Sequence, residues 1–172
     1  MPTLVVGISD CRCTNDSSVD LVTYALGSCI AVGAYDPVQG VGGLLHYLLP
    51  DSRQDHQRAT QQPAMYADTG IPLLIRSMER LGAQRKQIRV RLAGGAQMVS
   101  DTAQLAVGKR NQLAARKLLW QMGVLVEMEA VGGTASRSLG LRVGTGEFWV
   151  QTNTQVEPRL PEPGHPVLVG AR

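Results

Sequence analysis

Hydrophobic residues fall in short runs through the first third of the chain. Val, Ile, Leu and Tyr dominate these runs, and Gly27, Pro37 and Gly40 separate them. Short apolar segments between turn-forming residues are typical of buried β-strands joined by tight turns. The pattern therefore predicts a hairpin-rich first half, with strands at residues 19–25, 29–35 and 41–49.

The apolar spacing changes to a helical period over residues 65–81. One helical stripe is apolar: Ile71, Leu74, Ile75, Met78 and Leu81. Charged side chains lie off this stripe, which predicts an amphipathic helix. We expect Asp68 or Thr69 to cap its main body. Pro72 should be tolerated only in its first turn, and Gly82 should end it.

The second half predicts more strands and a second helix. Apolar residues alternate with arginine at 88–93 and with glutamate at 124–130, as in half-buried strands. The helix, residues 111–122, ends at Gly123 and turns five side chains inward: Ala114, Ala115, Leu118, Leu119 and Met122. A last hairpin is expected at 138–143 and 147–152.

These elements add up to an α/β fold. We predict a single domain over residues 1–172, with hairpin-rich packed β-sheets and two amphipathic helices on the outside, in an α/β/β sandwich-like arrangement. The length, 172 residues, suits one domain that buries its own core. Residues 153–172 are expected to form a Pro-rich connection and tail.

Composition and charge narrow the expected partners. The net charge is +3 and the basic residues are spread along the chain, so we expect no nucleic-acid partner. No apolar run approaches the roughly 18 to 20 residues of a membrane helix, so no membrane insertion is expected. Three cysteines, two of them close together, do not suggest a disulfide framework. We therefore expect a cytoplasmic protein.

Several familiar motifs fail on inspection. In "GVGGLL", Leu45 stands where a dinucleotide-binding loop needs its third glycine. Around "GKR", Ala103 and Arg110 replace the first glycine and the Ser or Thr of a phosphate loop. "ALGSC" lacks the Gly-x-Ser-x-Gly of a nucleophile elbow. These classes of nucleotide-binding and serine-hydrolase site are therefore not indicated.

Metal binding is weakly indicated at two places. Cys11 and Cys13 lack a second cysteine pair, which favours two thiols in a loop over a metal site. The segment "DSRQDH" offers Asp51, Asp55 and His56, but Ser, Arg and Gln stand between them. We interpret this segment as a solvated loop, and we expect no metal and no organic cofactor.

Cys29 and His46 remain, and the residues alone leave two interpretations open. Free cysteine is often buried, and a histidine among leucines can be a hydrogen-bonded core residue. Alternatively, Cys29 is a nucleophile, His46 is its base, and the Gly27 and Ser28 turn exposes the thiol and directs N–H groups at an oxyanion. Thr23 is then a candidate hydroxyl to orient His46, although it also suits an ordinary strand position.

The segment around these residues resembles the CheD family, the chemoreceptor glutamine deamidases of bacterial chemotaxis. The resemblance covers roughly residues 21–150, and its motifs occur in the family's order. They are "LGSCIAVGAYDPVQGVGGLLHYLLP", "MYADTGIPLLIRSMERLGA", "RLAGGAQM", "VGKRN" and "VGGTASR". This sequence departs from the family pattern at Arg91, Ala130 and Ser136. We expect these three departures to affect substrate docking or loop shape and not the chemistry.

The resemblance implies a function and a site. Cys29 would be the nucleophile, His46 the general base and acid, and Thr23 the residue that orients His46, with Gly27 and Ser28 supporting the oxyanion. The implied activity converts glutamine to glutamate on cytoplasmic domains of methyl-accepting chemotaxis receptors and releases ammonia. A CheC-type phosphatase is an implied partner. The alternative is a non-catalytic or dual-role adaptor that binds receptors and the phosphatase.

Overall fold

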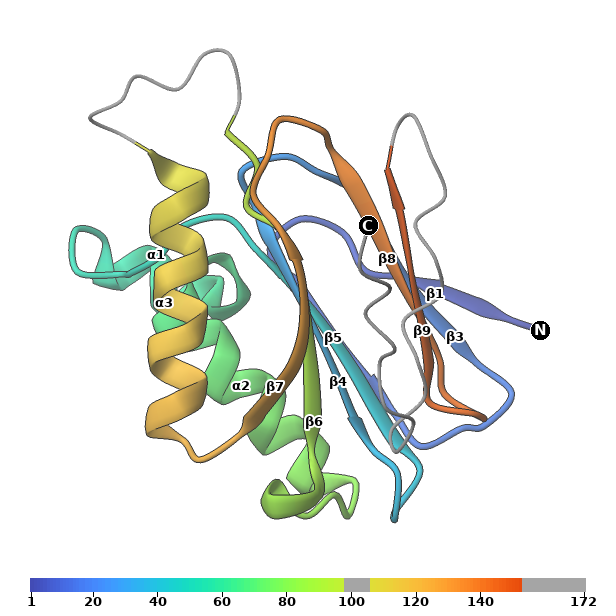
Figure 1. The fold of residues 1–172 in the computed structure, drawn as a ribbon. Helices are drawn as coiled ribbons and strands as arrows, with labels where there is room; N and C mark the ends of the chain where they lie inside the picture. Colours follow the sequence, from blue (N-terminus) through green and yellow to red (C-terminus); the bar gives the residue numbers. More distant parts are fainter. Residues whose placement is uncertain (98–105, 153–172) are drawn as a thin grey trace.

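The computed structural model describes residues 1–97 and 106–152. A five-stranded sheet lies in the middle, with helices against one face and a four-stranded sheet against the other (Figure 1). The predicted α/β/β layering is therefore confirmed. One hydrophobic core fills the space between helices and central sheet, and a second fills the space between the two sheets.

Both sheets mix strands from distant parts of the chain. The four-stranded sheet has the order β1-β3-β8-β9: β1 (Thr3–Val5), β3 (Asp20–Leu26), β8 (Arg137–Arg142) and β9 (Glu147–Thr152). The central sheet has the order β2-β5-β4-β6-β7: β2 (Asp10–Thr14), β5 (Val41–Tyr47), β4 (Ile30–Asp36), β6 (Arg89–Gly94) and β7 (Leu125–Val131). The predicted hairpins of β4 with β5 and of β8 with β9 are confirmed.

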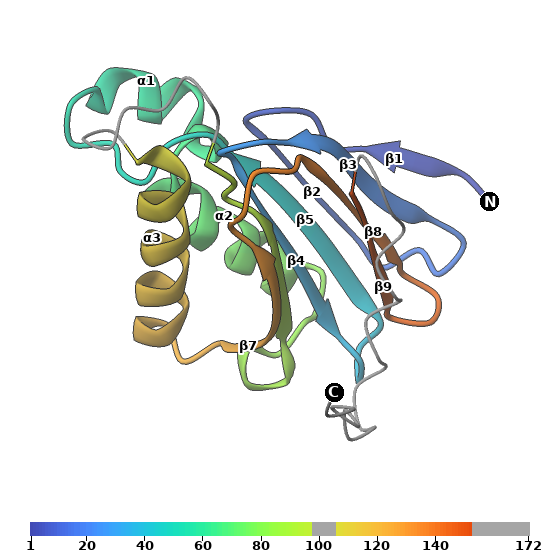
Figure 2. The same cartoon turned by 45° about the horizontal axis from the view of Figure 1, so that its top comes forward.

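The described residues form five helices: α1 (His56–Gln61), η1 (Pro63–Met65), α2 (Ala67–Arg80), η2 (Arg85–Gln87) and α3 (Val107–Gln121). The two long ones, α2 and α3, lie on the outer face of the central sheet (Figure 2). The predicted stripe of α2 is buried at Ile71, Leu74, Ile75 and Met78. Glycines with positive φ, Gly82 and Gly123, follow α2 and α3 as predicted.

The start of α2 differs from the prediction. Tyr66 is the N-cap residue, and no side chain caps the helix. Asp68 instead accepts hydrogen bonds from Ser52, and Thr69 donates one to the Pro63 carbonyl. Pro72 lies inside the helix rather than in its first turn. The burial of the apolar stripe therefore outweighs the local cost of an internal proline.

One edge strand of each sheet, β1 and β2, escaped prediction. β1 is exposed and only three residues long, and β2 carries Asp10 before its two cysteines and Arg12 between them. Such short, polar edge strands lack the alternation that marks a half-buried strand. Cys11 and Cys13 consequently lie in a strand paired with β5, and the predicted thiol loop is wrong.

The link between β6 and β7 is a helical crossover. These two strands run parallel, and α3 starts at Val107, four residues before the predicted start. Parallel strands require such a connection, because a tight turn joins only antiparallel strands. The predicted tail, residues 153–172, lies outside the described residues. In the described part of the chain, no helix has the length and hydropathy to cross a bilayer.

Candidate functional site

Cys29 and His46 lie on one face of the central sheet. Cys29 immediately precedes β4, and Ala31 of β4 pairs with His46 of β5. Strand residues two apart share a face, and Cys29 stands two positions before Ala31, at the start of β4. Cys29 and Ala31 both pack in the core between the two sheets. The sequence-predicted thiol and imidazole therefore share one intersheet region.

Thr23 meets His46 from the opposite sheet. Its Oγ1 lies 2.9 Å from His46 Nδ1 and 2.6 Å from the Val6 carbonyl oxygen. A carbonyl oxygen only accepts, so the single hydroxyl hydrogen of Thr23 is donated to Val6. Thr23 Oγ1 then accepts from Nδ1–H of His46. This arrangement leaves the lone pair on Nε2 of His46.

Nε2 of His46 is buried and has no hydrogen-bond partner within residues 1–97 and 106–152. His46 as a whole is 1% exposed. A buried ring nitrogen without a donor is uncommon in folded proteins, because desolvation is then uncompensated. The pair Thr23 and Val6 thus holds an imidazole whose free nitrogen can accept a proton.

Burial favours the neutral forms of both candidate groups. It raises the pKa of the Cys29 thiol, and the N–H of Cys29 itself lowers that pKa in part. Burial also lowers the pKa of His46 from 6.5 to about 4. Both shifts follow from the cost of placing a charge in the core. At neutral pH the resting site is therefore a thiol beside a neutral imidazole.

A β-bulge directly follows Thr23. The pairing of β3 with β8 shifts register between Thr23 and Leu26, and Ala25 has a φ of 57°. A positive φ is unfavourable for alanine, and bulges of this kind redirect a strand beside functional sites. Here the bulge lies near the end of the strand that carries Thr23, and the strand then ends at Leu26, before the turn that leads to Cys29.

The turn at Gly27 to Cys29 is held by its carbonyl groups. The Gly27 carbonyl accepts from Ala96 N–H at 2.8 Å, and the Cys29 carbonyl accepts from Gly95 N–H at 2.7 Å. Gly94 and Gly95 both have positive φ, which allows this close backbone approach. The "AGGA" segment at the end of β6 therefore supports the turn that carries the thiol.

Asn111 is a buried polar residue at this site, and no role of its own was predicted for it from the sequence. It lies in the second turn of α3, and its side-chain amide donates to the Ser28 carbonyl at 2.9 Å. Its position in "VGKRN" at a helix start was the available signal. Periodicity alone does not reveal that an asparagine on a helix is buried, so the contact of Asn111 with the turn could be found only from the structure.

The segment predicted to be a solvated loop borders a cavity. The cavity measures about 650 Å³, and Leu49, Arg58, Tyr66 and Arg110 are among its lining residues. It adjoins the end of β5, because Leu49 follows that strand by two positions.

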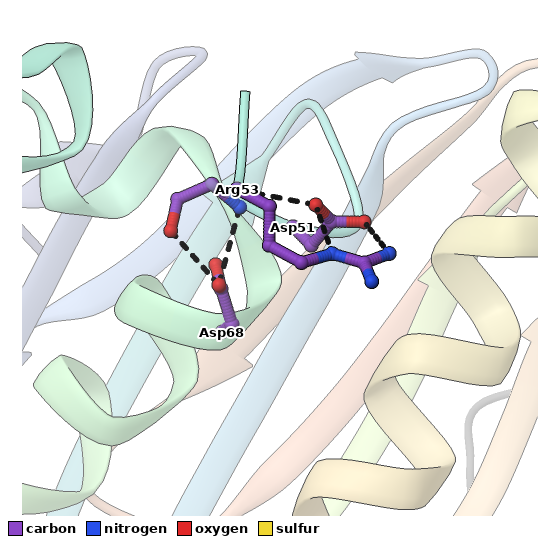
Figure 3. Close-up of polar contacts among 4 residues, drawn as sticks. Asp51, Arg53 and Asp68 are labelled. Atoms are coloured by element: carbon purple, nitrogen blue, oxygen red, sulfur yellow. Dashed lines mark hydrogen bonds and ion pairs between the residues drawn. The ribbon is translucent and has the colours of Figure 1, made fainter. Parts of the chain in front are cut away.

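Side chains of this segment pair with one another or with helices. Figure 3 shows Arg53 alongside Asp51, with a shortest distance of 3.1 Å, and Asp68 of α2 beside the same loop. Asp55 caps α1, which begins at His56, so the loop prediction is wrong at His56. In the described ranges, no three His, Cys, Asp or Glu side chains are grouped to hold a metal ion.

The family-pattern departures lie away from this loop. Arg91 is buried, pairs with Glu127 at 3.0 Å, and its guanidinium lies 4.5 Å from the centre of the Phe148 ring. Ala130, in β7, packs against the intersheet core. Arg91 therefore links the two sheets. Its buried position favours a structural role over the expected effect on substrate docking.

A thiol, a histidine on the same sheet face and a third group on the other histidine nitrogen have the layout of thiol-dependent hydrolase sites. The comparisons with known proteins identify the family. The family model "CheD chemotactic sensory transduction" matches residues 48–152. The chain belongs to the CheD family.

Two relatives cover nearly the whole chain. A probable chemoreceptor glutamine deamidase CheD from Solibacter usitatus is 46% identical over 95% of this chain and 99% of its own. A probable chemoreceptor glutamine deamidase CheD 1 from Syntrophus aciditrophicus is 47% identical over 89% of this chain and 96% of its own. A solved Neisseria meningitidis protein has a TM-score of 0.46 at 12% identity, covering 78% of this chain and 63% of its own. That last likeness has no bearing on function.

Proposed function

We propose that this protein is a cysteine-dependent protein-glutamine deamidase that acts on cytoplasmic domains of methyl-accepting chemotaxis receptors. Its CheD relatives carry the names of probable chemoreceptor glutamine deamidases. The observation that carries the proposal is the imidazole of His46. Thr23 and Val6 set its tautomer, and its Nε2 has no hydrogen-bond partner in the described part of the chain. Cys29 packs in the same core between the two sheets. The proposed setting is the cytoplasm, with a CheC-type phosphatase as a further partner.

The first half of the proposed reaction forms a thioester. Nε2 of His46 removes the proton from Cys29, and Sγ attacks the carboxamide carbon of a substrate glutamine. The tetrahedral intermediate collapses with cleavage of the C–N bond, and His46 gives its proton to the leaving ammonia. Because the resting pair is neutral, the proton moves as substrate is attacked, with no preformed thiolate and imidazolium.

The second half hydrolyses the thioester. His46, neutral again, takes a proton from water, and the hydroxide attacks the acyl carbon. The C–S bond breaks, the proton returns to Cys29, and the substrate residue leaves as glutamate. The new carboxylate changes the charge of the receptor helix at that position. Each step uses Cys29, His46 and water, so the proposal requires no added cofactor.

Backbone N–H groups are the proposed oxyanion donors. The N–H of Cys29 lies near its own sulfur, as its lowering effect on the thiol pKa indicates. A fixed donor beside the nucleophile stabilises negative charge that develops on the carbonyl oxygen, typically by about 3 kcal/mol per donor. Gly27 and Ser28 support this donor by shaping the turn.

The test is conversion of glutamine to glutamate. The protein is incubated with cytoplasmic receptor fragments, and mass spectrometry measures the 1 Da gain while ammonia is assayed in parallel. We expect conversion by the wild type and loss of at least about 1,000-fold in Cys29→Ala. Cys11→Ala is the matched control, because its thiol lies on the outer face of β2 and should leave the rate unchanged.

Two results would refute the proposal. Conversion by Cys29→Ala at the wild-type rate removes Cys29 from the chemistry. Binding of receptor fragments without conversion by the wild type, alongside an active reference deamidase, supports the adaptor alternative instead.

A further inference from the structure

Asn111 is a buried polar side chain that contacts the turn before Cys29 and has no role in the proposed reaction. It is fully buried, and its Nδ2 donates to the Ser28 carbonyl at 2.9 Å and to the Leu48 carbonyl at 3.0 Å. Both partners are carbonyl oxygens, which only accept. The amide must therefore present its NH2 group to them, and its orientation is fixed.

These two carbonyls lie where the pairing of β4 with β5 stops. The last paired residues are Ile30 and Tyr47, and the chain then diverges toward Ser28 on one side and Leu48 on the other. The amide of Asn111 bridges that divergence. One bond anchors the residue before Cys29, and the other anchors the second residue after His46.

The bond to Ser28 also fixes the Cys29 N–H. The Ser28 carbonyl and the Cys29 N–H belong to one planar trans peptide unit, so they point in opposite directions. Holding the carbonyl toward Asn111 turns the N–H away from α3. That N–H lies near the Cys29 sulfur, where the proposed oxyanion would form.

Asn111 is itself rigidly supported. The Tyr47 hydroxyl donates to the Asn111 carbonyl at 2.5 Å, and Gln112 Nε2 donates to the Gly95 carbonyl at 2.8 Å. At Gly108, a Cβ would lie 2.5 Å from the Ala96 carbonyl oxygen, so the start of α3 packs directly on the segment after β6. A fixed helix start is suited to hold a turn in one orientation.

We propose that Asn111 is a positioning residue that locks the Ser28 to Cys29 peptide and sets the placement of the Cys29 thiol relative to His46. This inference rests on the proposed deamidase function. It assigns Asn111 no contact with substrate. Its effect is on the transition state, because misplacement by about 1 Å is enough to cost about 100-fold in rate.

The test compares variants by their kcat and KM for ammonia release from a receptor fragment. Asn111→Leu keeps the side-chain size and removes both donors, and kcat is expected to fall about 10- to 100-fold with KM within about twofold. In Asn111→Asp a protonated carboxyl keeps one donor, so its loss should be smaller. Thr69→Val is the matched control. It removes the 2.6 Å hydrogen bond from Thr69 of α2 to the Pro63 carbonyl of η1, and it should leave kcat unchanged.

Tyr47→Phe protects the test against a folding failure. It removes only the hydroxyl that holds Asn111 from behind, and kcat should fall about 2- to 5-fold. Normal kcat in a folded Asn111→Leu, or a raised KM with kcat intact, would overturn the inference. If the Asn111 variants fail to fold, normal kcat in Tyr47→Phe overturns it.

A second measurement separates this inference from the proposed function. Hydrogen–deuterium exchange of residues 27–30 needs no substrate and is compared between Thr69→Val and the Asn111 and Tyr47 variants. We expect exchange in the folded variants of Asn111 or Tyr47 to be at least about tenfold faster than in the wild type. The exchange rate of the control Thr69→Val should equal that of the wild type. Unchanged exchange overturns the peptide lock even where deamidation occurs. Faster exchange in a protein with no deamidase activity supports the lock and refutes the function.

Discussion

The two ends of the β4 and β5 hairpin have opposite polar arrangements. At the turn, the buried carboxylate of Asp36 accepts from the N–H groups of Val38, Gln39 and Gln84 at 2.8 to 3.1 Å. At the open end, Nε2 of His46 is buried and unpaired within the described part of the chain. One hairpin thus has a satisfied end and an unsatisfied end.

Backbone conformation shows the same contrast. Gly40 takes the positive φ of the turn, where no Cβ is present to oppose it. Near the open end, a non-glycine residue, Ala25, takes a positive φ in the strand that carries Thr23. Folding therefore leaves a strained alanine and an unpaired acceptor at the open end. Such features concentrate at functional sites, where they serve chemistry in place of stability.

The largest expected effect separates the two ends by activity. His46→Gln keeps a polar side chain of similar reach but cannot accept the thiol proton at neutral pH. Deamidation should fall by about 1,000-fold, since positioned proton transfer contributes roughly that much. Ammonia release from receptor fragments measures it, with Asp36→Ala as the variant from the other end. Activity of His46→Gln within tenfold of wild type would show that the open end is only structural.

The second effect is a pH dependence of folding stability at the open end. The folded pKa of His46, about 4, lies below the unfolded value of 6.5. The unfolded chain therefore binds the extra proton between these values. Stability is complete above about pH 6.5 and is lost as the pH falls toward 4, by about 3 kcal/mol.

Urea unfolding at several pH values between 7 and 4 measures this loss. The variant His46→Gln removes the titrating group, so its stability should fall less steeply across the same window. Equal slopes in wild type and variant would mean that His46 does not carry the dependence.

The sequence predicted the hairpin and the pair of Cys29 and His46, but not the contacts between the two sheets that surround this pair. Strands β4 and β5 are recognisable because their apolar runs end at turn residues, and the family motifs indicated the same two side chains. The link between Thr23 and His46 was expected from the family motifs, but the contact of Val6 with Thr23 was not predictable. Val6 follows β1, a short exposed edge strand that pairs parallel with β3. Contacts across sheets depend on register and layer spacing, which local periodicity does not encode.

The third effect tests the satisfied end. Asp36→Ala leaves three backbone N–H groups without their acceptor, and the free energy of unfolding should fall by about 2 kcal/mol. Deamidation by the folded fraction should stay within about twofold of wild type, because the change lies at the far end of the hairpin. Urea unfolding and ammonia release are measured on the same preparation. A large loss of kcat with stability intact would contradict the division of roles between the two ends.

The smallest effect concerns the two positive φ angles. Ala25→Gly removes an unfavourable Cβ from the bulge, so it should raise the free energy of unfolding by no more than about 1 kcal/mol. Gly40→Ala places a Cβ at a positive φ, so it should lower that free energy by about the same amount. Relief of strain beside Thr23 also frees the bulge to move, so deamidation should fall modestly in Ala25→Gly and stay unchanged in Gly40→Ala. Thermal unfolding and ammonia release check both signs. If Ala25→Gly is neutral in stability and activity, the bulge stores no strain that matters, and the contrast between the ends rests on His46 alone.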